Sequence, residues 1–222
     1  MSKRTLGVAA GSRLGCDAAV EVARAGGNAV DACLAAAVAA WVTEPFFASV
    51  AGSGFVVVRS PEDTVEVFDG NNAVPLDARE AHAGMKRVFL DYSNGMYTGI
   101  GGGSVAVPGA LAAAHHAWER YGSIEWPALL APAIAAARTG IPFPATSAYY
   151  LSVTWGPIWS SYASARRVFG EEEPLTEGMP LVQPELADTL QSIATGGPGV
   201  LYGGELGEAI VAALGADGGV MT

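Results

Sequence analysis

Residues 25–58 read AGGNAVDACLAAAVAAWVTEPFFASVAGSGFVVV, and this stretch decides the fold. Gly26 and Gly27 are expected to end a preceding helix, because glycine readily takes the left-handed conformation that follows many helix C-termini. Asn28 then stands at an N-cap position, and Asp31, three residues on, supplies an acidic form of the capping box. The stretch therefore predicts one helix ending at Gly26 and another beginning after Asn28.

The second helix, residues 29–42, is rich in alanine and apolar on nearly every side. A helix with that pattern is a buried helix. Glu44 and Pro45 are expected to end it. Residues 52–54 then turn the chain into residues 55–58, an apolar run that reads as a strand covered on both faces. We therefore expect a buried helix packed against a sheet at the centre of the fold.

The rest of the chain is expected to form a short N-terminal strand, a second strand that completes a hairpin, a long loop and several helices. Residues 64–68 are expected to pair with 55–58 in an antiparallel hairpin. Residues 76–98 read as a loop of a length that suits a flap over a pocket. The other expected elements are a strand over 6–10 and helices over 13–25, 110–121, 126–140, 205–214 and from Pro184 onward.

Composition narrows the class of protein. Hydrophobic residues make up 50% of the 222 residues and charged residues 15%, against about 25% charged in typical globular chains. Such a chain is expected to be covered by a partner chain over part of its surface, as one domain unit over residues 1–222. The net charge of −10, without a Lys/Arg stripe, argues against nucleic acid as a partner. No apolar window reads as a membrane span.

The cysteines and the N-terminus add two expectations. Cys16 and Cys33, the two cysteines of the sequence, have no metal-type spacing and are expected to be buried, inert thiols in alanine-rich helices. The first residues, MSKRTLGVAAG, lack the apolar core of a signal peptide, which predicts a cytoplasmic protein. His115 and His116 are adjacent on a helix, so they cannot chelate one metal as an i, i+4 pair would, and no metal site or cofactor is expected.

Short motifs along the chain occur in the order found in one known family. They are GGNAVDA at 26–32, TEP at 43–45, GSGF at 52–55, VPG at 107–109, PAIAAARTG at 132–140, QPELADTL at 183–190, GPGVLYGG at 197–204 and GGVMT at 218–222. Together they resemble the large-subunit segment of the gamma-glutamyltranspeptidase family, from about Gly7 to Thr222, with Leu201 where phenylalanine is usual.

The resemblance implies a fold and a mechanism. The fold is α/β (α+β), the four-layer αββα sandwich of the N-terminal-nucleophile (Ntn) hydrolases, completed by a small-subunit chain. In that family a precursor cuts itself, and the new N-terminal threonine of the small subunit becomes the nucleophile. No catalytic residue is therefore expected in this chain, and Thr222 matches an ordinary large-subunit position. A small-molecule amide is the expected substrate, and a dimer of heterodimers is a possible assembly.

One departure from the family pattern falls at Asn71 and Asn72. After the Asp-Gly pair the family carries Arg-Glu, and that arginine grips the α-carboxylate of the glutamyl substrate. A guanidinium gives a bidentate, charge-assisted clamp, whereas an asparagine offers uncharged hydrogen bonds. We therefore predict amide hydrolysis with altered acyl recognition, with Asn71 and Asn72 as the substrate-binding residues. An alternative, equally weighted, is that the two asparagines only build a turn.

Three further interpretations stay open at this level. The aromatic residues Tyr149, Tyr150, Trp155, Trp159 and Tyr162 are expected to be packing residues, with a pocket wall for an apolar acyl group as the alternative. The glycine-rich stretch 99–103 invites a nucleotide site, but it lacks the Lys-Ser/Thr of a phosphate loop. A non-catalytic binding or scaffold module derived from the large subunit is the alternative to an enzyme.

Overall fold

The computed structural model describes residues 5–75 and 84–222, and the chain forms two compact units, each described here by itself. The first unit consists of Met1–Asn71, Pro108–Thr139 and Pro184–Pro198, and the second of Asn72–Val107, Gly140–Gln183 and Gly199–Thr222. The single domain over residues 1–222 stays a prediction. Four loop residues noted for a possible flap lie outside the described residues, namely Asp77, Arg79, Glu80 and His82.

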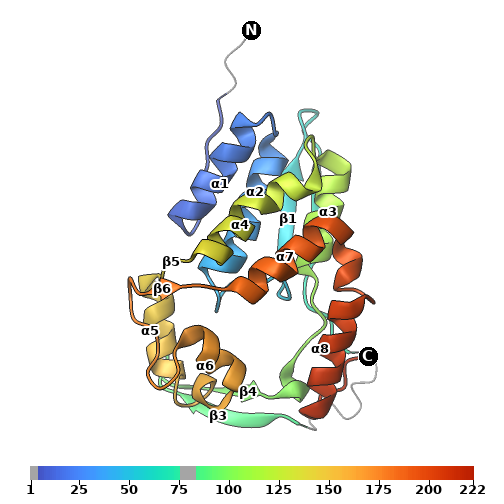
Figure 1. The fold of residues 1–222 in the computed structure, drawn as a ribbon. Coiled ribbons are helices and arrows are strands. Elements are labelled where there is room, and N and C mark those ends of the chain that lie inside the picture. The colour runs from blue at the N-terminus through green and yellow to red at the C-terminus, as the bar shows by residue number, and fades with distance from the viewer. Residues whose placement is uncertain (1–4, 76–83) are drawn as a thin grey trace. The chain divides into compact units, whose positions relative to one another are not determined.

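The first unit is a group of helices with one β-hairpin. Its elements are α1 (Arg13–Arg24), α2 (Ala29–Thr43), β1 (Gly54–Arg59), β2 (Val65–Gly70), α3 (Ala110–Tyr121), α4 (Trp126–Thr139) and α7 (Pro184–Gly196). Helix α2 lies beside α1 and α4, and α4 lies beside α7 (Figure 1). The sequence predicts all of these helices and the hairpin, and each predicted boundary agrees with the structure to within two residues.

The junction between α1 and α2 forms as the sequence predicts. Gly26 has φ 106°, and the N–H of Gly27 donates to the carbonyl of Val22 at 3.0 Å, which closes the end of α1. The Asn28 side chain accepts from the N–H groups of Val30 and Asp31, and the Asp31 carboxylate accepts from the Asn28 N–H. Both halves of the capping box are present, so α2 begins where the sequence predicts.

Helix α2 is buried, but its main neighbours are helices. It contacts α1 and α4 most extensively and α3 to a smaller extent, while α3 contacts both strands of the hairpin. The prediction of a helix packed directly against a sheet is corrected accordingly, since α3 covers the hairpin. Small alanine side chains at Ala32, Ala35 and Ala39, each at most 2% exposed, let the neighbouring backbones approach.

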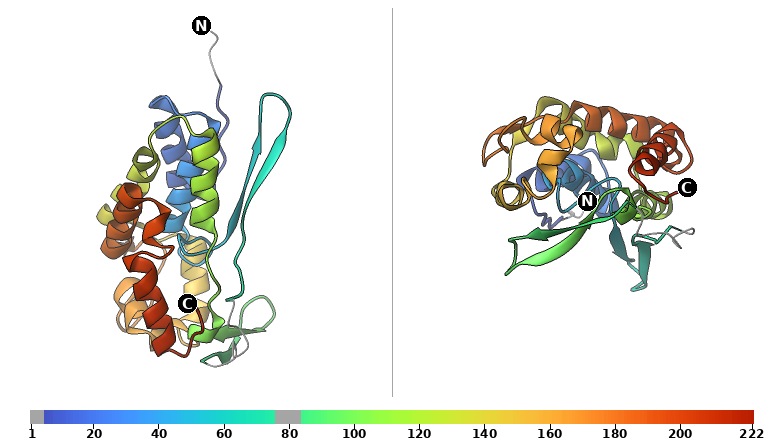
Figure 2. Two further views of the ribbon diagram at one scale, coloured as in Figure 1. Left: turned by 90° about the vertical axis from the view of Figure 1, so that its right-hand side faces the viewer. Right: turned by 90° about the horizontal axis from the view of Figure 1, so that it is seen from below.

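The β1–β2 hairpin is antiparallel, as predicted, with Val57 opposite Val67. The prediction that β1 is covered on both faces is wrong for this chain, because Phe55 and Val57 are 59% and 63% exposed. Within the described residues one helix, α3, packs on the hairpin, and the left view of Figure 2 shows α3 beside one face of it. An apolar run is buried on both faces only where two layers are present.

Two other predictions in the first unit need correction. Residues 6–10 form no strand, and Leu6 and Val8 instead line a small cavity with residues of α1 and α2. Cys33 is exposed and Cys16 is half-buried, so the prediction of two buried thiols is wrong for Cys33. Burial of α2 is therefore incomplete on the side that carries Cys33.

The described part of the second unit contains the β3–β4 hairpin, one pair of short antiparallel strands that are distant in sequence, and several helices. Its elements are β3 (Lys86–Leu90), β4 (Met96–Ile100), the 3₁₀ helix η2 (Gly102–Ser104), β5 (Ile141–Pro142), α5 (Ala145–Thr154), the 3₁₀ helix η3 (Trp159–Ser161), α6 (Ala163–Phe169), β6 (Pro180–Leu181) and α8 (Glu205–Ala216). The 3₁₀ helix Pro198–Val200 spans the boundary between the last segment of the first unit, which ends at Pro198, and the last segment of the second unit, which begins at Gly199. Its core includes Phe143, Leu151 and Leu181, each at most 1% exposed.

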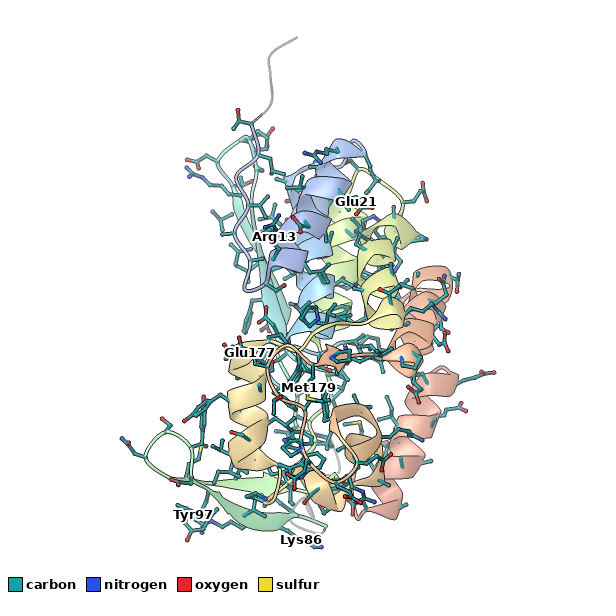
Figure 3. All side chains as sticks on the ribbon, turned by 60° about the vertical axis from the view of Figure 1, so that its left-hand side comes forward. Arg13, Glu21, Lys86, Tyr97, Glu177 and Met179 are labelled. Carbon is teal, nitrogen blue, oxygen red and sulfur yellow. The ribbon has the colours of Figure 1, made fainter. Side chains whose placement is uncertain are left out.

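The β3–β4 hairpin corrects the prediction of a loop over residues 76–98. Asn94 and Gly95 take positive φ values of 70° and 86° in the connecting turn, and Phe89 pairs with Tyr97 across the strands. Lys86 and Tyr97 lie on the two strands of this hairpin in Figure 3, and the Arg87 guanidinium lies 4.1 Å from the centre of the Tyr97 ring. Asn-Gly between two such runs is the typical hairpin signal.

Candidate functional site

The candidate site predicted from the sequence begins where strand β2 ends. The backbone N–H of Asn71 donates to Oδ1 of Asp69 at 2.8 Å, a local turn of the kind that Asp often forms. Asn71 and Asn72 are both exposed. The turn therefore uses the backbone of Asn71 and leaves the bulk of both side chains on the surface.

Close packing at Gly70 fixes the backbone of this corner. A Cβ atom placed on Gly70 would lie 2.7 Å from the Ala113 Cβ atom and from the carbonyl oxygens of Gly54 and Gly109. No larger residue fits there unless the backbone moves. The end of β2 is thus held against the start of α3, and Asn71 follows directly from it.

The start of α3 is fixed by the glycine corner at residues 52–54. The N–H groups of Gly109 and Ala110 donate to the carbonyl oxygen of Gly52 at 3.1 and 3.0 Å. These are N–H groups that a helix leaves without an intrahelical partner. Downstream of Asn72, Ala73 and Val107 exchange two backbone hydrogen bonds of 3.0 and 2.8 Å. The segments on both sides of the asparagines are therefore fixed by backbone contacts.

The electrostatics of the corner differ from those of an arginine clamp. Residues 69–75, DGNNAVP, contain one charged side chain, and it is the carboxylate of Asp69. This stretch therefore supplies no positive charge that could pair with a substrate carboxylate. The chemical capacity of this corner is hydrogen bonding by two amides. The substrate-facing and turn-only interpretations of Asn71 and Asn72 both remain predictions.

A cavity in the second unit brings together two features that the sequence left apart. It has a volume of about 400 Å³. Its lining includes the glycine-rich residues 99–102 and three of the five tyrosine and tryptophan residues of the 141–170 region, Tyr150, Trp159 and Tyr162. Tyr149 and Trp155 are not part of the lining. The sequence missed Asp217, whose carboxylate also lines the cavity and accepts from the N–H of Gly102 at 2.9 Å.

This arrangement weakens the interpretation of the glycine cluster as a nucleotide site. Phosphate loops present free backbone N–H groups to an anion. Here the Gly102 N–H donates to a carboxylate, and the Ser104 hydroxyl donates to the carbonyl of Gly101 at 2.7 Å. A phosphate group would meet the negative charge of Asp217.

The two adjacent histidines belong to the packing of α3. His115 packs against Trp118 and Trp126, with ring centres 5.1 and 5.0 Å away, and burial lowers the pKa of His115 below its ordinary value. The polar contacts of His115 and His116 are to Glu119, at 3.6 and 4.0 Å. Within the part of the chain that the structure describes, neither imidazole is hydrogen-bonded to a hydroxyl or a thiol that it could activate. Over residues 5–75 and 84–222, no group of three metal-ligand side chains is found.

None of the helices in the described part of the chain combines the length and hydrophobicity needed to cross a membrane.

Comparison with solved structures defines the class of fold. A gamma-glutamyltranspeptidase from Pseudomonas nitroreducens, solved in complex with L-DON, matches 100% of this chain and 64% of its own, with a TM-score of 0.84 and 29% identity. The fold is thus the mixed helix-and-strand fold of the Ntn hydrolases, as predicted.

The chain belongs to the gamma-glutamyltranspeptidase family, whose model matches residues 15–222. It is 32% identical over 204 residues to glutathione hydrolase proenzyme 1 of Schizosaccharomyces pombe, covering 91% of this chain and 31% of that protein. It is 31% identical over 211 residues to the acylase ACY 1 proenzyme of Pseudomonas sp. strain SE83, covering 92% and 37%. The chain spans about a third of the length of these curated relatives.

Proposed function

We propose that this chain forms the large-subunit part of an autoprocessed Ntn amidohydrolase or acyltransferase whose acyl recognition does not depend on an arginine. The family membership of residues 15–222, together with the Asn71–Asn72 corner, carries this proposal. The nucleophile is the N-terminal threonine of a small subunit cut from the same precursor. The relatives' names include both glutathione hydrolases and an acylase, so an amide bond is the common target.

In the proposed mechanism the small subunit supplies the nucleophile, and this chain supplies part of the substrate-binding wall. The α-amine of the N-terminal threonine acts as general base for its own hydroxyl, which attacks the amide carbonyl. Backbone N–H groups stabilise the negative oxygen of the tetrahedral intermediate, and water or an amine then releases the acyl group. This chain contributes half of the four-layer sandwich and, at Asn71 and Asn72, part of the wall that contacts the acyl group.

The charge at the corner points to the class of acyl group. An ion pair between arginine and carboxylate is roughly twice as strong as a neutral hydrogen bond, and Asn71 cannot form one. The carboxylate of Asp69 adds a negative charge two residues away. We therefore infer an acyl group that lacks a carboxylate at this position, such as a neutral amide or β-lactam side chain, in place of a γ-glutamyl group.

The exposed apolar face of the β1–β2 hairpin is an argument for a partner chain that covers it. Phe55, Val57, Val65 and Val67 are 56–63% exposed and lie on alternate positions of the two strands. An isolated two-stranded hairpin is at best marginally stable, and further strands with a hydrophobic face stabilise it. The small subunit is the proposed cover for this face. A dimer of such heterodimers and a cytoplasmic location remain predictions.

Intact mass under denaturing conditions, combined with N-terminal sequencing of the purified native protein, tests the proposal. A second chain that begins with threonine is the expected result. Replacement of that threonine by alanine should then leave an uncut precursor and abolish amide hydrolysis. If the native protein contains no second chain, the catalytic half is missing, and the non-catalytic binding or scaffold module becomes the better interpretation.

A further inference from the structure

The cavity of the second unit has an aromatic and apolar lining. Tyr150 comes from α5, Trp159 from η3, and Tyr162 from the residue that precedes α6. The large aliphatic residues of the lining are Ile100, Val105, Ile158 and Leu214. The volume of about 400 Å³ lies within the range of small-molecule sites. Because aromatic faces carry a negative electrostatic potential, such a lining attracts cations as well as apolar groups.

The charge that lines this cavity has a single sign. Among the lining residues, Asp217 is the one with an ionisable acidic or basic side chain apart from the tyrosines. Asp217 is also the C-cap residue of α8, and the last turn of α8 contains no basic residue. The C-terminal end of a helix carries a partial negative charge, so a carboxylate there adds to an existing negative potential. Leu214, in the same last turn, lines the cavity as well.

The Asp217 carboxylate keeps acceptor capacity for a ligand. Its Oδ2 atom accepts one hydrogen bond, from the Gly102 N–H at 2.9 Å, and a carboxylate has about four acceptor positions. That hydrogen bond fixes the carboxylate against η2 at the cavity wall. The aromatic rings are fixed as well, since the Trp159 indole N–H donates to Oγ1 of Thr154 at 3.0 Å and Tyr150 packs edge-on against Tyr92.

We propose that this cavity binds a small organic cation of the alkylammonium or methylated ammonium class. The ammonium group lies near the Asp217 carboxylate and the end of α8, and its alkyl groups contact Tyr150, Trp159 and Tyr162. Methyl groups spread the positive charge over an apolar surface, which suits a site that combines aromatic rings with one carboxylate. An anionic ligand is excluded by the same charges. This site is additional to the proposed amide hydrolysis and does not depend on it.

Choline and its uncharged isostere 3,3-dimethylbutan-1-ol test the proposal, with isothermal titration calorimetry on the native protein as the measurement. The two molecules have nearly the same shape and differ in charge. We expect saturable binding of choline, weaker at high salt because Asp217 is exposed, and at least about tenfold weaker binding of the isostere. Absence of saturable choline binding at tens of millimolar, or equal binding of the two molecules, would overturn the proposal.

Two variants locate the site. Asp217→Asn removes the charge but keeps an oxygen acceptor for the Gly102 N–H, so it preserves the local fold. We expect it to weaken choline binding about tenfold, and Trp159→Phe to weaken it about threefold to tenfold, because indole is the strongest cation–π partner. Trp155→Phe is the matched control, since Trp155 lies on the same segment outside the cavity lining. Unchanged binding in folded Asp217→Asn and Trp159→Phe, as judged by circular dichroism, would place the cation elsewhere.

Discussion

Asn71 is the residue at which we propose that acyl recognition departs from the family pattern. If its side chain faces the acyl pocket, Asn71→Arg restores a charged clamp and raises kcat/KM for γ-glutamyl anilides about tenfold or more, as expected for a hydrogen bond to a charged group. Steady-state hydrolysis by the processed enzyme measures this. Asn71→Gln, which lengthens the side chain without adding charge, serves as the control. Equal activity of all three proteins would favour the turn-only interpretation.

Asp31 is the residue that stabilises the first unit through hydrogen bonds. Its fully buried carboxylate accepts from the Asn28 N–H at 2.8 Å, from the Ser123 N–H at 3.1 Å and from the Ser123 hydroxyl at 2.5 Å. It thus joins the start of α2 to the loop between α3 and α4.

Asp31→Ala removes a buried, charged acceptor that serves three donors, so we expect a loss of about 2–3 kcal/mol in the free energy of unfolding. Urea denaturation followed by circular dichroism measures it. Asp17→Ala on α1, which removes an exposed pair with Arg13, should cost less than about 0.5 kcal/mol. A similar loss in both variants would contradict a special role for the buried carboxylate.

Helices α3 and α4 meet at His115, and we expect this contact to depend on pH. The His115 ring packs against Trp118 on α3 and Trp126 on α4, which also contact each other, and its side chain is 15% exposed. Burial lowers its pKa below the ordinary value of 6.5, against the opposing influence of Glu119. The unfolded chain therefore binds a proton more readily than the folded chain.

The contribution of His115 to stability is accordingly present above about pH 6.5 and is lost as the pH falls through its folded pKa. Between about pH 7 and about pH 5, we expect the free energy of unfolding to fall more in the native protein than in His115→Gln. His116→Gln, at the exposed neighbouring position, removes only the smallest of the influences on the His115 pKa and should change the pH dependence less than His115→Gln does. Identical pH profiles for the native protein and His115→Gln would refute this assignment.

The elements that the sequence predicts well are those fixed by local chemistry. Gly26, Asn28 and Asp31 determine a helix end and a helix start within six residues, and the structure confirms both. The β3–β4 hairpin was missed although Asn94-Gly95 is a turn signal, because the flanking runs were read as part of a loop. The burial of Phe55 and Val57 was mispredicted, since an apolar run does not reveal how many layers the chain itself supplies.

The candidate site residues also fall into two groups, those that the sequence predicts and those that only tertiary packing brings together. Asn71 and Asn72 could be named from the sequence because the resemblance predicts an Arg-Glu pair at these positions. The cavity could not be assembled, because Gly102, Trp159 and Asp217 lie far apart in sequence and are brought together by tertiary packing. The hydrogen bond between Asp217 and Gly102 spans 115 positions, which no local pattern encodes.

At the scale of the whole molecule, the two compact units are interleaved along the chain. The chain passes between the units after Asn71, Val107, Thr139, Gln183 and Pro198, so neither unit is one continuous segment. Unfolding of either unit releases the ends of every segment of the other. We therefore predict a single cooperative unfolding transition over residues 1–222, as in a single domain.

Two matched core variants test this prediction. Leu129 in the first unit and Leu151 in the second are both 0% exposed, and replacing each with alanine removes the same atoms, at a cost of about 2–5 kcal/mol. If unfolding is one transition, Leu129→Ala and Leu151→Ala each lower the midpoint of a single denaturant curve, and near-ultraviolet and far-ultraviolet circular dichroism give coincident curves. If each variant instead shifts one of two separate transitions, the units unfold independently, because a core mutation then affects only the unit that contains it.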